Sequence, residues 1–424
     1  MGRGSSPAVY TPPLMRRLLL AVLVAVAFAA TADDLQRADE LAWAKEFAAA
    51  EALYRQILAK QPQSGAAKLG LARVVMWQGR YPEAIRLFAQ LDSVDALEGR
   101  ATALYWSGDL RGAARGFREV LERDASRDFA RTSLAEIAST ALPSQRVSVE
   151  GSTDDQPLDA IRSEIAATFF SDPQSRWTAT VGAWRAGPRP AVPPAPGRPG
   201  GGDRSGEYAS VSNETTWRGL TAGGSLGVFT WPNGVRRPIG SASVRYRQVT
   251  VSIVRRPELA TATSLRTHPA STTTSLRWDY SRNVIAAAEV SHRRYFDGNE
   301  GSGAYAYAIV PLRRNAWTFW SGASVAARDT DESRFTEAGV YDPYWTPDNL
   351  VEARAVFALE RRFLKVHADA GRARDRGLSY HPWRAGLTAN VDLARGFRIE
   401  AGIERSSTVD YRSTSFHAAL VRRR

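Results

Sequence analysis

The sequence contains no cysteine among its 424 residues. A chain without cysteine has no disulfide framework, no thiolate metal site and no thiol nucleophile. Its apolar run from Leu18 to Ala30 is 13 residues long, whereas a helix needs about 20 apolar residues to span a bilayer. These absences exclude a small disulfide-stapled fold, cysteine-based catalysis and an anchor helix at this run.

Histidine is also scarce and scattered. The five histidines are His268, His292, His367, His381 and His417. No two of them have the spacing of metal ligands. Ser415 and His417 share one face of a predicted strand, an arrangement that a hydrolase could use, but polar residues of a channel wall explain them equally. Acidic residues in the predicted loop 329–346 could hold calcium or simply face solvent. We therefore predict no enzyme, no cofactor and no metal.

Residues 15–32 predict a secretory signal peptide. Arg16 and Arg17 supply the positive end, and the apolar run follows. Ala30-Thr31-Ala32 is a small-x-small cleavage site, which places the cut between Ala32 and Asp33. Residues 1–14 are interpreted as an extension upstream of the true start. We expect an exported chain without a nucleic-acid partner.

An internal repeat runs through residues 33–143. A tryptophan, an alanine and a ring residue recur after 34 residues and again after 29. The repeated residues are Trp43, Ala50 and Tyr54, then Trp77, Ala84 and Phe88, then Trp106, Ala113 and Phe117. Gly79 and Gly108 mark the turn after the tryptophan, and Tyr81 follows the first of them. Lys45 stands at this glycine position in the first copy.

This pattern resembles the tetratricopeptide repeat. Its small residues would let two antiparallel helices approach closely, with the aromatic residues filling the space between them. Pro62 closes the first repeat, as proline often does after a helix. Three repeats are about the minimum for a stable solenoid. The resemblance implies a short α-solenoid that binds a protein or a polymer on its concave face, and a structural spacer is the alternative.

Residues 144–424 have the pattern of β-strands, and Pro143 separates them from the helical part. We predict about sixteen strands of the length that suits a tilted membrane strand. They are 145–153, 158–170, 175–186, 206–217, 220–231, 239–247, 249–255, 271–281, 283–295, 302–312, 315–328, 347–360, 363–373, 383–393, 396–407 and 411–421.

The connections between these strands alternate in length. Short turns occur at 171–174, 218–219, 281–283 and 394–396, and long connections at 187–206, 256–270 and 329–346. Outer-membrane barrels have such parity, because short periplasmic turns and longer extracellular loops lie on opposite rims. A soluble sandwich has no reason for it. The prediction is therefore an antiparallel transmembrane β-barrel (144–424) behind a periplasmic helical unit (33–143), located in the bacterial outer membrane and surrounded by its lipid.

Positive charge is concentrated in the barrel. The net charge is +12, and residues 33–143 carry 15 basic and 16 acidic groups against 38 and 28 in residues 144–424. Arginines mark the short turns: Arg176, Arg218, Arg247, Arg282, Arg313, Arg314, Arg361, Arg362, Arg395 and Arg422 to Arg424. This pattern predicts a basic periplasmic ring, which would meet anionic headgroups or guide an anionic polymer. The alternative is that polar residues simply populate turns.

Two stretches of the barrel look like parts of the C-terminal barrel of cellulose synthase operon protein C. The residues that carry the match are Arg255, Arg256, Pro257, Ser264 and Leu265 in 254–265, and Tyr344, Trp345, Thr346 and Pro347 in 335–347. Pro343 stands where that family has glycine. The order of repeats followed by barrel is also similar to that of YaiO-type outer-membrane proteins. The resemblance implies export of a secreted polysaccharide, as in cellulose biosynthesis and biofilm formation.

A hydrated lumen for sugar would present aromatic faces and arginine forks. The candidate lining residues are Trp184, Arg185, Tyr246, Trp278, Arg293, Tyr295 and Arg354. Trp217 and Trp231, near strand ends, are interpreted instead as members of a lipid-facing aromatic girdle. A register error of one residue would reverse every such assignment.

We thus predict passage of a polysaccharide, neutral or anionic, through the barrel, with the repeats binding the polymer or a periplasmic protein. Two alternatives remain at this point. One is a scaffold whose barrel only anchors the repeats, and the other is a barrel enzyme acting on lipid or glycan.

Overall fold

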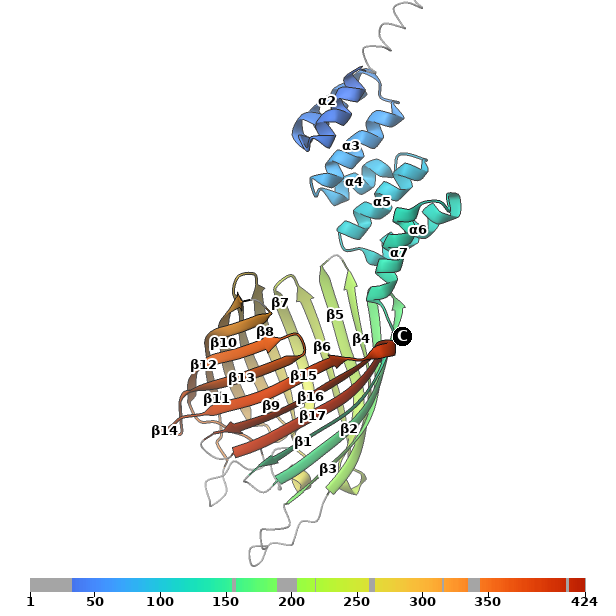
Figure 1. Ribbon diagram of the computed structural model, residues 1–424. Coiled ribbons are helices and arrows are strands. Elements are labelled where there is room, and N and C mark those ends of the chain that lie inside the picture. Colours follow the sequence, from blue (N-terminus) through green and yellow to red (C-terminus); the bar gives the residue numbers. More distant parts are fainter. Residues whose placement is uncertain are drawn as a thin grey trace, which may run out of the picture. The chain divides into compact units, whose positions relative to one another are not determined.

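The computed structural model describes residues 33–154, 158–188, 204–217, 219–258, 264–314, 316–334, 344–408 and 412–423. The chain divides into two compact units after Ala138 (Figure 1), and each is described by itself. The predicted signal peptide, with Ala32 at its cleavage site, lies outside the described residues. Within the described ranges, no helix has the length and apolar character needed to cross a bilayer.

The first unit is a row of antiparallel helices. A helix over 33–43 precedes α2 (Phe47–Lys60), α3 (Gly65–Trp77), α4 (Tyr81–Phe88), α5 (Val94–Trp106), α6 (Leu110–Arg123) and α7 (Asp128–Thr140). Side-chain oxygens satisfy the free amides at three helix starts. Ser64 Oγ accepts from Ala67 N at 3.3 Å, Ser93 Oγ accepts from Ala96 N at 3.1 Å, and Asp109 Oδ1 accepts from Gly112 N at 2.8 Å.

Close helix packing in this unit depends on two glycines that the repeat pattern does not include. A Cβ on Gly70 would lie 2.4 Å from the ring of Tyr54, and one on Gly99 would lie 2.5 Å from the ring of Phe88. Both rings are buried, as are Ala50, Ala84, Ala113 and Phe117 at the other repeat positions. Only glycine leaves room for these rings, so a larger residue at 70 or 99 would overpack the core.

Lys45 adopts the backbone conformation of the glycines it replaces. Its φ is 64°, and Gly79 and Gly108 have φ of 78° and 83°. A left-handed residue after a helix is usually glycine, because a side chain there costs about 1 kcal/mol. The first repeat therefore keeps the same turn despite its different residue.

Two of the three repeat tryptophans do not fill the helix interface. Trp43 is 77% exposed and Trp106 is 44% exposed. The core instead consists of smaller residues around Tyr54, Phe88 and Phe117. The predicted packing role is therefore wrong for Trp43 and Trp106, because both project from the ends of their helices. Trp77 is half-buried against the core.

The second unit is one antiparallel sheet that closes on itself, since β17 pairs with β1 over its whole length (Figure 1). Its strands are β1 (Ser144–Asp154), β2 (Leu158–Asp172), β3 (Ser175–Pro188), β4 (Arg204–Trp217), β5 (Leu220–Thr230), β6 (Arg236–Tyr246), β7 (Val249–Pro257), β8 (Ala270–Ser281), β9 (Ile285–Tyr295), β10 (Glu300–Arg314), β11 (Trp317–Thr330), β12 (Leu350–Arg361), β13 (Leu364–Asp375), β14 (Leu378–Tyr380), β15 (Trp383–Asp392), β16 (Phe397–Ser407) and β17 (Arg412–Arg423). The short segments η1 (Pro232–Gly234), α8 (Ser264–Thr267) and η2 (Ala394–Gly396) lie between strands.

Strands β14 and β15 together occupy one strand position of the barrel. Ala373 of β13 pairs with Tyr380 and Ala370 pairs with Trp383, which is the same register across a two-residue gap. Pro382 occupies that gap, and proline cannot donate to the ladder. Counted in this way, the barrel has 16 strand positions, which confirms the predicted fold class. The predicted strand ends agree with the observed ones to within three residues, and only β14 was not expected.

Alternation along the strands separates two faces. Large apolar side chains on one face are exposed, for example Leu226 at 81%, Val211 at 48% and Ile403 at 54%. The intervening residues are polar or small, such as Ser210 and Ser212 beside Val211. We call the exposed apolar side chains the outer band; it comprises Val147, Ile165, Val181, Val211, Leu226, Val251, Leu276, Val290, Val325, Val351, Phe357 and Ile403. A barrel in lipid has such an apolar outer face, and the other face lines its interior.

Candidate functional site

The register decides which predicted residues face the lumen. Arg162 of β2 pairs with Trp184, and the same inner face continues through the ladder to Arg293, Tyr295 and Arg354. Trp184, Arg293, Tyr295 and Arg354 therefore lie on the inner face. The inner face also includes Tyr305, which pairs with Glu289.

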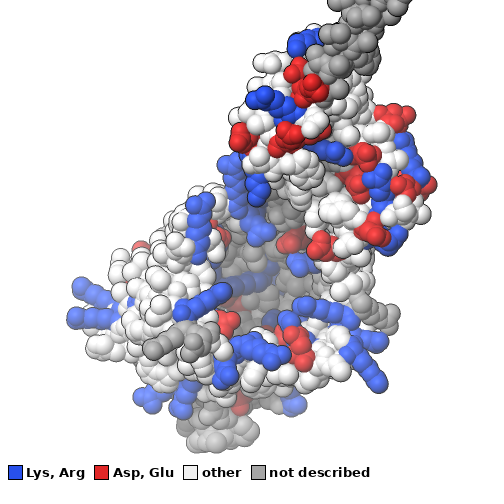
Figure 2. All heavy atoms as spheres, turned by 45° about the horizontal axis from the view of Figure 1, so that its top comes forward, with Lys and Arg blue, Asp and Glu red and all other residues white. Residues whose placement is uncertain are grey.

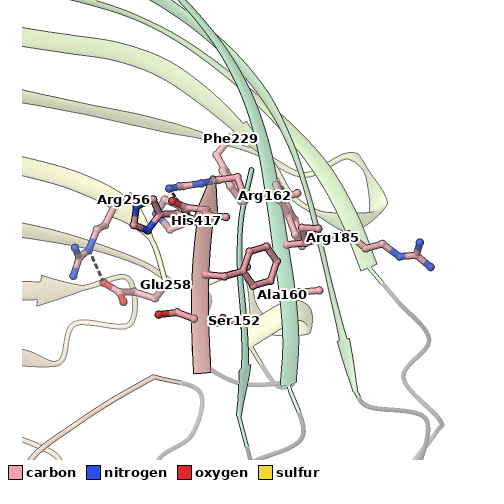
Figure 3. Close-up of a pocket in the computed structure, with 16 residues that line it drawn as sticks. Ser152, Ala160, Arg162, Arg185, Phe229, Arg256, Glu258 and His417 are labelled. Atoms are coloured by element: carbon pink, nitrogen blue, oxygen red, sulfur yellow. Dashed lines mark ion pairs between the residues drawn. The ribbon is translucent and has the colours of Figure 1, made fainter. Parts of the chain in front are cut away.

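Three of the predicted lining residues lie on the outer face. Arg185 is the neighbour of inward Trp184, and its side chain points away from the lumen (Figure 3). Tyr246 and Trp278 are 53% and 44% exposed and share the outer face with the apolar band. The lining prediction is wrong for these three, because composition alone does not reveal strand parity. Trp217, 56% exposed near a short turn, lies on the outer face as a girdle residue would.

A buried aromatic cluster closes part of the barrel beside β3 and β5. Trp184 stacks on Phe229 at a ring distance of 5.4 Å, and Trp231 meets Phe229 edge-on at 5.2 Å. Trp231 is 1% exposed, so its predicted place in the lipid-facing girdle is wrong. Trp184 is only 4% exposed, and its Nε1 donates to Thr230 O at 3.2 Å. Trp184 thus faces inward but is packed into the wall and exposes little surface to a passing ligand.

Ion pairs cover the lumenal face of β12 to β16. Asp369, whose side chain is 2% exposed, accepts from Arg354 at 2.6 Å and from Arg384 at 2.7 Å. Arg354 also pairs with Glu352 at 2.7 Å, and Glu404 lies 3.8 Å from Arg384. Buried charges need such partners, because an unpaired one loses its hydration without compensation. This side of the lumen is therefore a rigid, charge-paired wall.

The opposite lumenal wall, on β5 to β8, carries small polar residues beside the Arg277–Asp279 ion pair. Ser225 and Ser241 are hydrogen-bonded at 2.9 Å, and Ser252 and Ser275 at 2.8 Å. Short side chains leave space in front of them. The lumen is thus asymmetric, because the serine side has short side chains in addition to an ion pair, whereas the other side is covered by ion pairs.

A cavity of about 580 Å³ lies against β1, β2 and β17 on the lumenal side (Figure 3). Its lining includes Glu150, Arg162, Arg256 and His417, and Arg162 pairs with Glu150. Ser415 lines it too, but within the described residues no hydrogen bond joins Ser415 to His417. The residues the structure describes also contain no group of three or more His, Asp or Glu side chains that could hold a metal ion. The cavity offers polar contacts of both charges to a ligand.

The structure brings the two stretches of family resemblance together at the end of β9. Arg256 Nε lies 3.5 Å from Glu258, and Glu258 lies 3.9 Å from Arg293 Nη1. Two residues further along β9, Tyr295 stacks on Tyr344 with a ring distance of 4.0 Å. Segments about 90 residues apart in the sequence therefore meet on Arg293 and Tyr295.

Tyr344 anchors the end of the long connection between β11 and β12. It is fully buried, and its hydroxyl donates to the Asp297 carboxylate at 2.8 Å. Burial and this neighbouring carboxylate raise the pKa of Tyr344 above its usual value. Thr346, also fully buried, accepts from Arg334 N at 2.9 Å. Residues 344–347 are thus held firmly at the barrel mouth, and Phe335 to Pro343 lie outside the described residues.

The remaining residues of these two stretches have separate places. Trp345 lies under the guanidinium of lumenal Arg328, 5.1 Å from ring centre to Cζ. Ser264 is fully buried at the start of α8, and Arg255 points to the outer face beside Thr272. The side chain of Leu265 lies outside the described part of the chain.

Three arginines of the predicted basic ring stack on outward aromatic rings. The Arg247, Arg361 and Arg422 guanidinium carbons lie 5.3, 5.1 and 5.5 Å from the rings of Tyr246, Trp317 and Phe397. Figure 2 shows basic side chains around the hollowed opening at the short-turn end. Because their rings face outward, these three arginines have the position of headgroup contacts. Arg218, Arg424 and the Arg314 side chain lie outside the described residues.

Sequence reasoning missed the accessible aromatic residues of the lumen. Tyr305 and Tyr307 lie on the inner face with rings 5.9 Å apart, and Trp320 donates to Glu360 at 3.1 Å. A signal was present, since Tyr305 and Tyr307 alternate with alanines that face outward. Such alternation of large inward and small outward residues is visible once a strand is assigned.

In the helical unit, Glu51 joins α2 to the turn before α4. Its carboxylate accepts from Arg80 at 2.6 Å, from Arg55 at 2.8 Å and from Gln78 at 2.9 Å. The hydrogen bond from Arg80 is the main cause that lowers the pKa of Glu51 to about 2. The charged form is thus favoured in the folded unit.

We expect Glu51→Gln to destabilise the helical unit by about 1 kcal/mol at neutral pH. Because the folded pKa of Glu51 is depressed, its contribution is present above the unfolded value near 4.5 and disappears as the pH falls toward 2. Urea unfolding of the full chain, followed by helical circular dichroism at several pH values, measures this. Glu122→Gln, at an exposed residue of α6, is the matched control. Equal pH dependence in wild type and Glu51→Gln would disprove the role of Glu51.

Comparisons with known proteins agree with both units. A family model described as tetratricopeptide repeat matches residues 43–105. Among solved structures, a bacterial polysaccharide outer membrane secretin is 12% identical, with a TM-score of 0.50 over 67% of this chain and 99% of that chain. CdiB from Acinetobacter baumannii is 10% identical, with a TM-score of 0.42 over 66% of this chain and 60% of that chain. Curated protein sequences give no match. The helical unit therefore carries a match to the tetratricopeptide repeat, and the second unit has the fold of outer-membrane β-barrels.

Proposed function

We propose that the barrel exports a secreted polysaccharide and that the helical repeats act on the periplasmic side. The observation that carries this proposal is the lumenal face, which combines accessible tyrosines with arginines held in ion pairs. Such a surface offers stacking faces and hydrogen bonds to a hydrated polymer while exposing little apolar area. The likeness to a polysaccharide secretin supports the fold on which the proposal depends.

The ion pairing of the lumenal arginines suits movement of a polysaccharide through the lumen better than tight binding of it. Lumenal Arg277 is engaged by Asp279 at 2.8 Å and Glu289 at 3.4 Å. Arg354 is engaged by Asp369 and Glu352. A paired arginine has donors left for sugar hydroxyls but less free charge to retain an anionic chain. A polymer would therefore make many weak contacts and keep moving.

The anchored end of the long connection would control access to this path. Tyr344 holds residues 344–347 against Tyr295 and Asp297 at the long-loop end of the barrel. Removing the hydroxyl bonds would loosen this anchor while leaving the ring stack in place. Tyr344→Phe is therefore the variant that separates opening of the path from loss of the fold.

The proposal is tested by efflux of oligosaccharides from liposomes that contain the purified full-length protein. We expect a linear oligosaccharide to escape faster than a branched one of equal mass, and Tyr344→Phe to increase the rate severalfold. Trp217→Phe, on the outer face, is the control and should leave the rate unchanged. Efflux no faster than from protein-free liposomes, in the wild type and in Tyr344→Phe, would contradict export and favour the scaffold.

A further inference from the structure

The three repeat tryptophans occupy the same position in each copy, and two of them are exposed. Trp43, Trp77 and Trp106 end the helix 33–43, α3 and α5. Trp43 is 77% exposed, Trp106 is 44% exposed and Trp77 is half-buried. Isolated exposed apolar residues are common on proteins, but a recurrence at one structural position in three repeats is not a single isolated case.

Aromatic contacts join these residues in two pairs, each between neighbouring repeats. The rings of Trp43 and Trp77 are 5.9 Å apart, and the rings of Tyr81 and Trp106 are 6.5 Å apart. We call Trp43, Trp77, Tyr81 and Trp106 the tryptophan ladder. Trp43 and Trp106 belong to neither buried core of the unit. Helix packing therefore does not explain why these two positions hold tryptophan.

The helical unit carries no excess charge of one sign that would attract an ionic ligand to the ladder. Between the first two repeats, the charges of Arg55 and Arg80 are satisfied by Glu51. Residues 33–143 as a whole carry 15 basic and 16 acidic groups. A ligand of this surface would thus be recognised through uncharged ring faces and hydroxyl groups.

We propose that the tryptophan ladder binds an uncharged sugar chain by stacking on the faces of its rings, with one contact in each repeat. The negative face of an aromatic ring attracts the polarised C–H groups of a sugar ring. A polymer of identical units matches a surface built from identical repeats, whereas a peptide of mixed sequence does not. The inference rests on the proposed export function, to which it adds the binding surface and the ligand class.

Calorimetric titration of the full-length protein in detergent tests this inference. The probes are linear neutral gluco-oligosaccharides of increasing length, a uronic acid oligosaccharide and a proline-rich peptide. We expect affinity for the neutral series to rise with length and to be the same at low and high salt. The double variant Trp43→Ala with Trp106→Ala should weaken binding about tenfold. Trp43→Tyr with Trp106→Tyr should retain most of it.

Trp217→Ala, which removes an exposed tryptophan of the barrel, is the matched control and should bind as the wild type does. Unchanged affinity in the double alanine variant, stronger salt-sensitive binding of the uronic acid probe, or ladder-dependent binding of the peptide alone would each overturn the inference. Liposome efflux separates the two proposals. Sugar binding at the ladder without efflux would contradict export only, and efflux without sugar binding would contradict the ladder only.

Discussion

Asp369→Ala is expected to lower the free energy of barrel unfolding by about 2–3 kcal/mol. Its buried carboxylate accepts from Arg354 and from Arg384 at once. Removal leaves Arg354, whose side chain is 16% exposed, with one carboxylate partner fewer, whereas Arg384 is 46% exposed and keeps Glu404 at 3.8 Å. Arg354 retains Glu352, so the variant should still fold.

Guanidinium chloride unfolding of the protein in lipid vesicles measures this difference. Asp279→Ala is the matched control, because its carboxylate also binds a lumenal arginine but its side chain is 45% exposed. Exposed pairs contribute less than about 1 kcal/mol. An Asp369→Ala variant within 1 kcal/mol of the Asp279→Ala variant would show that the charge-paired wall does not hold the barrel together.

Leu226→Arg is expected to destabilise the barrel in lipid by about 2–4 kcal/mol, the cost of a cation near the bilayer midplane. Leu226 lies in the middle of β5 and is 81% exposed on the outer face. Ser225→Arg is the control on the adjacent inner position, where Ser241 and neighbouring small residues leave space for the side chain. The same unfolding measurement in vesicles compares the two. A larger loss for Ser225→Arg than for Leu226→Arg would reverse the assignment of the two faces.

The fold could be predicted because its signals are local. Strand length, turn residues and the parity of connection lengths all appear in the sequence, and the repeat spacing of 34 residues marks the helical unit. The sequence did not predict β14 as a separate strand, because Pro382 interrupts a strand whose two parts keep the same register against β13. Local sequence patterns were thus sufficient to locate the helices and strands. They did not predict the break between β14 and β15, across which the pairing register with β13 is kept.

The lumenal side chains could be predicted only in part, because facing direction depends on register through the whole sheet. Arg293 and Arg354 were placed correctly, whereas Arg185, Tyr246 and Trp278 were not. Whether a side chain points into or out of the barrel follows from the pairing register with the neighbouring strand. Composition alone therefore cannot predict this direction. Burial is similarly non-local, since Trp231 looks like a girdle residue until Phe229 and Trp184 are found packed against it.

The meeting of the two resemblance stretches was also beyond sequence reasoning. Arg256 and Tyr344 are distant in the chain, and β9 joins them through Arg293 and Tyr295. Neither β9 residue belongs to the resembling stretches. A contact of this kind depends on strand order and stagger, which follow from closure of the barrel rather than from local propensity.

The most direct test of the account is single-channel conductance of cysteine variants in planar bilayers. The chain has no native cysteine, so one introduced thiol reports one position. Ser291 lies on the inner face of β9, and its neighbour Val290 is 54% exposed on the outer face. A charged, water-soluble thiol reagent should reduce the current of Ser291→Cys and leave Val290→Cys unchanged. No current through either variant, or modification of Val290→Cys alone, would contradict a hydrated passage lined by this face.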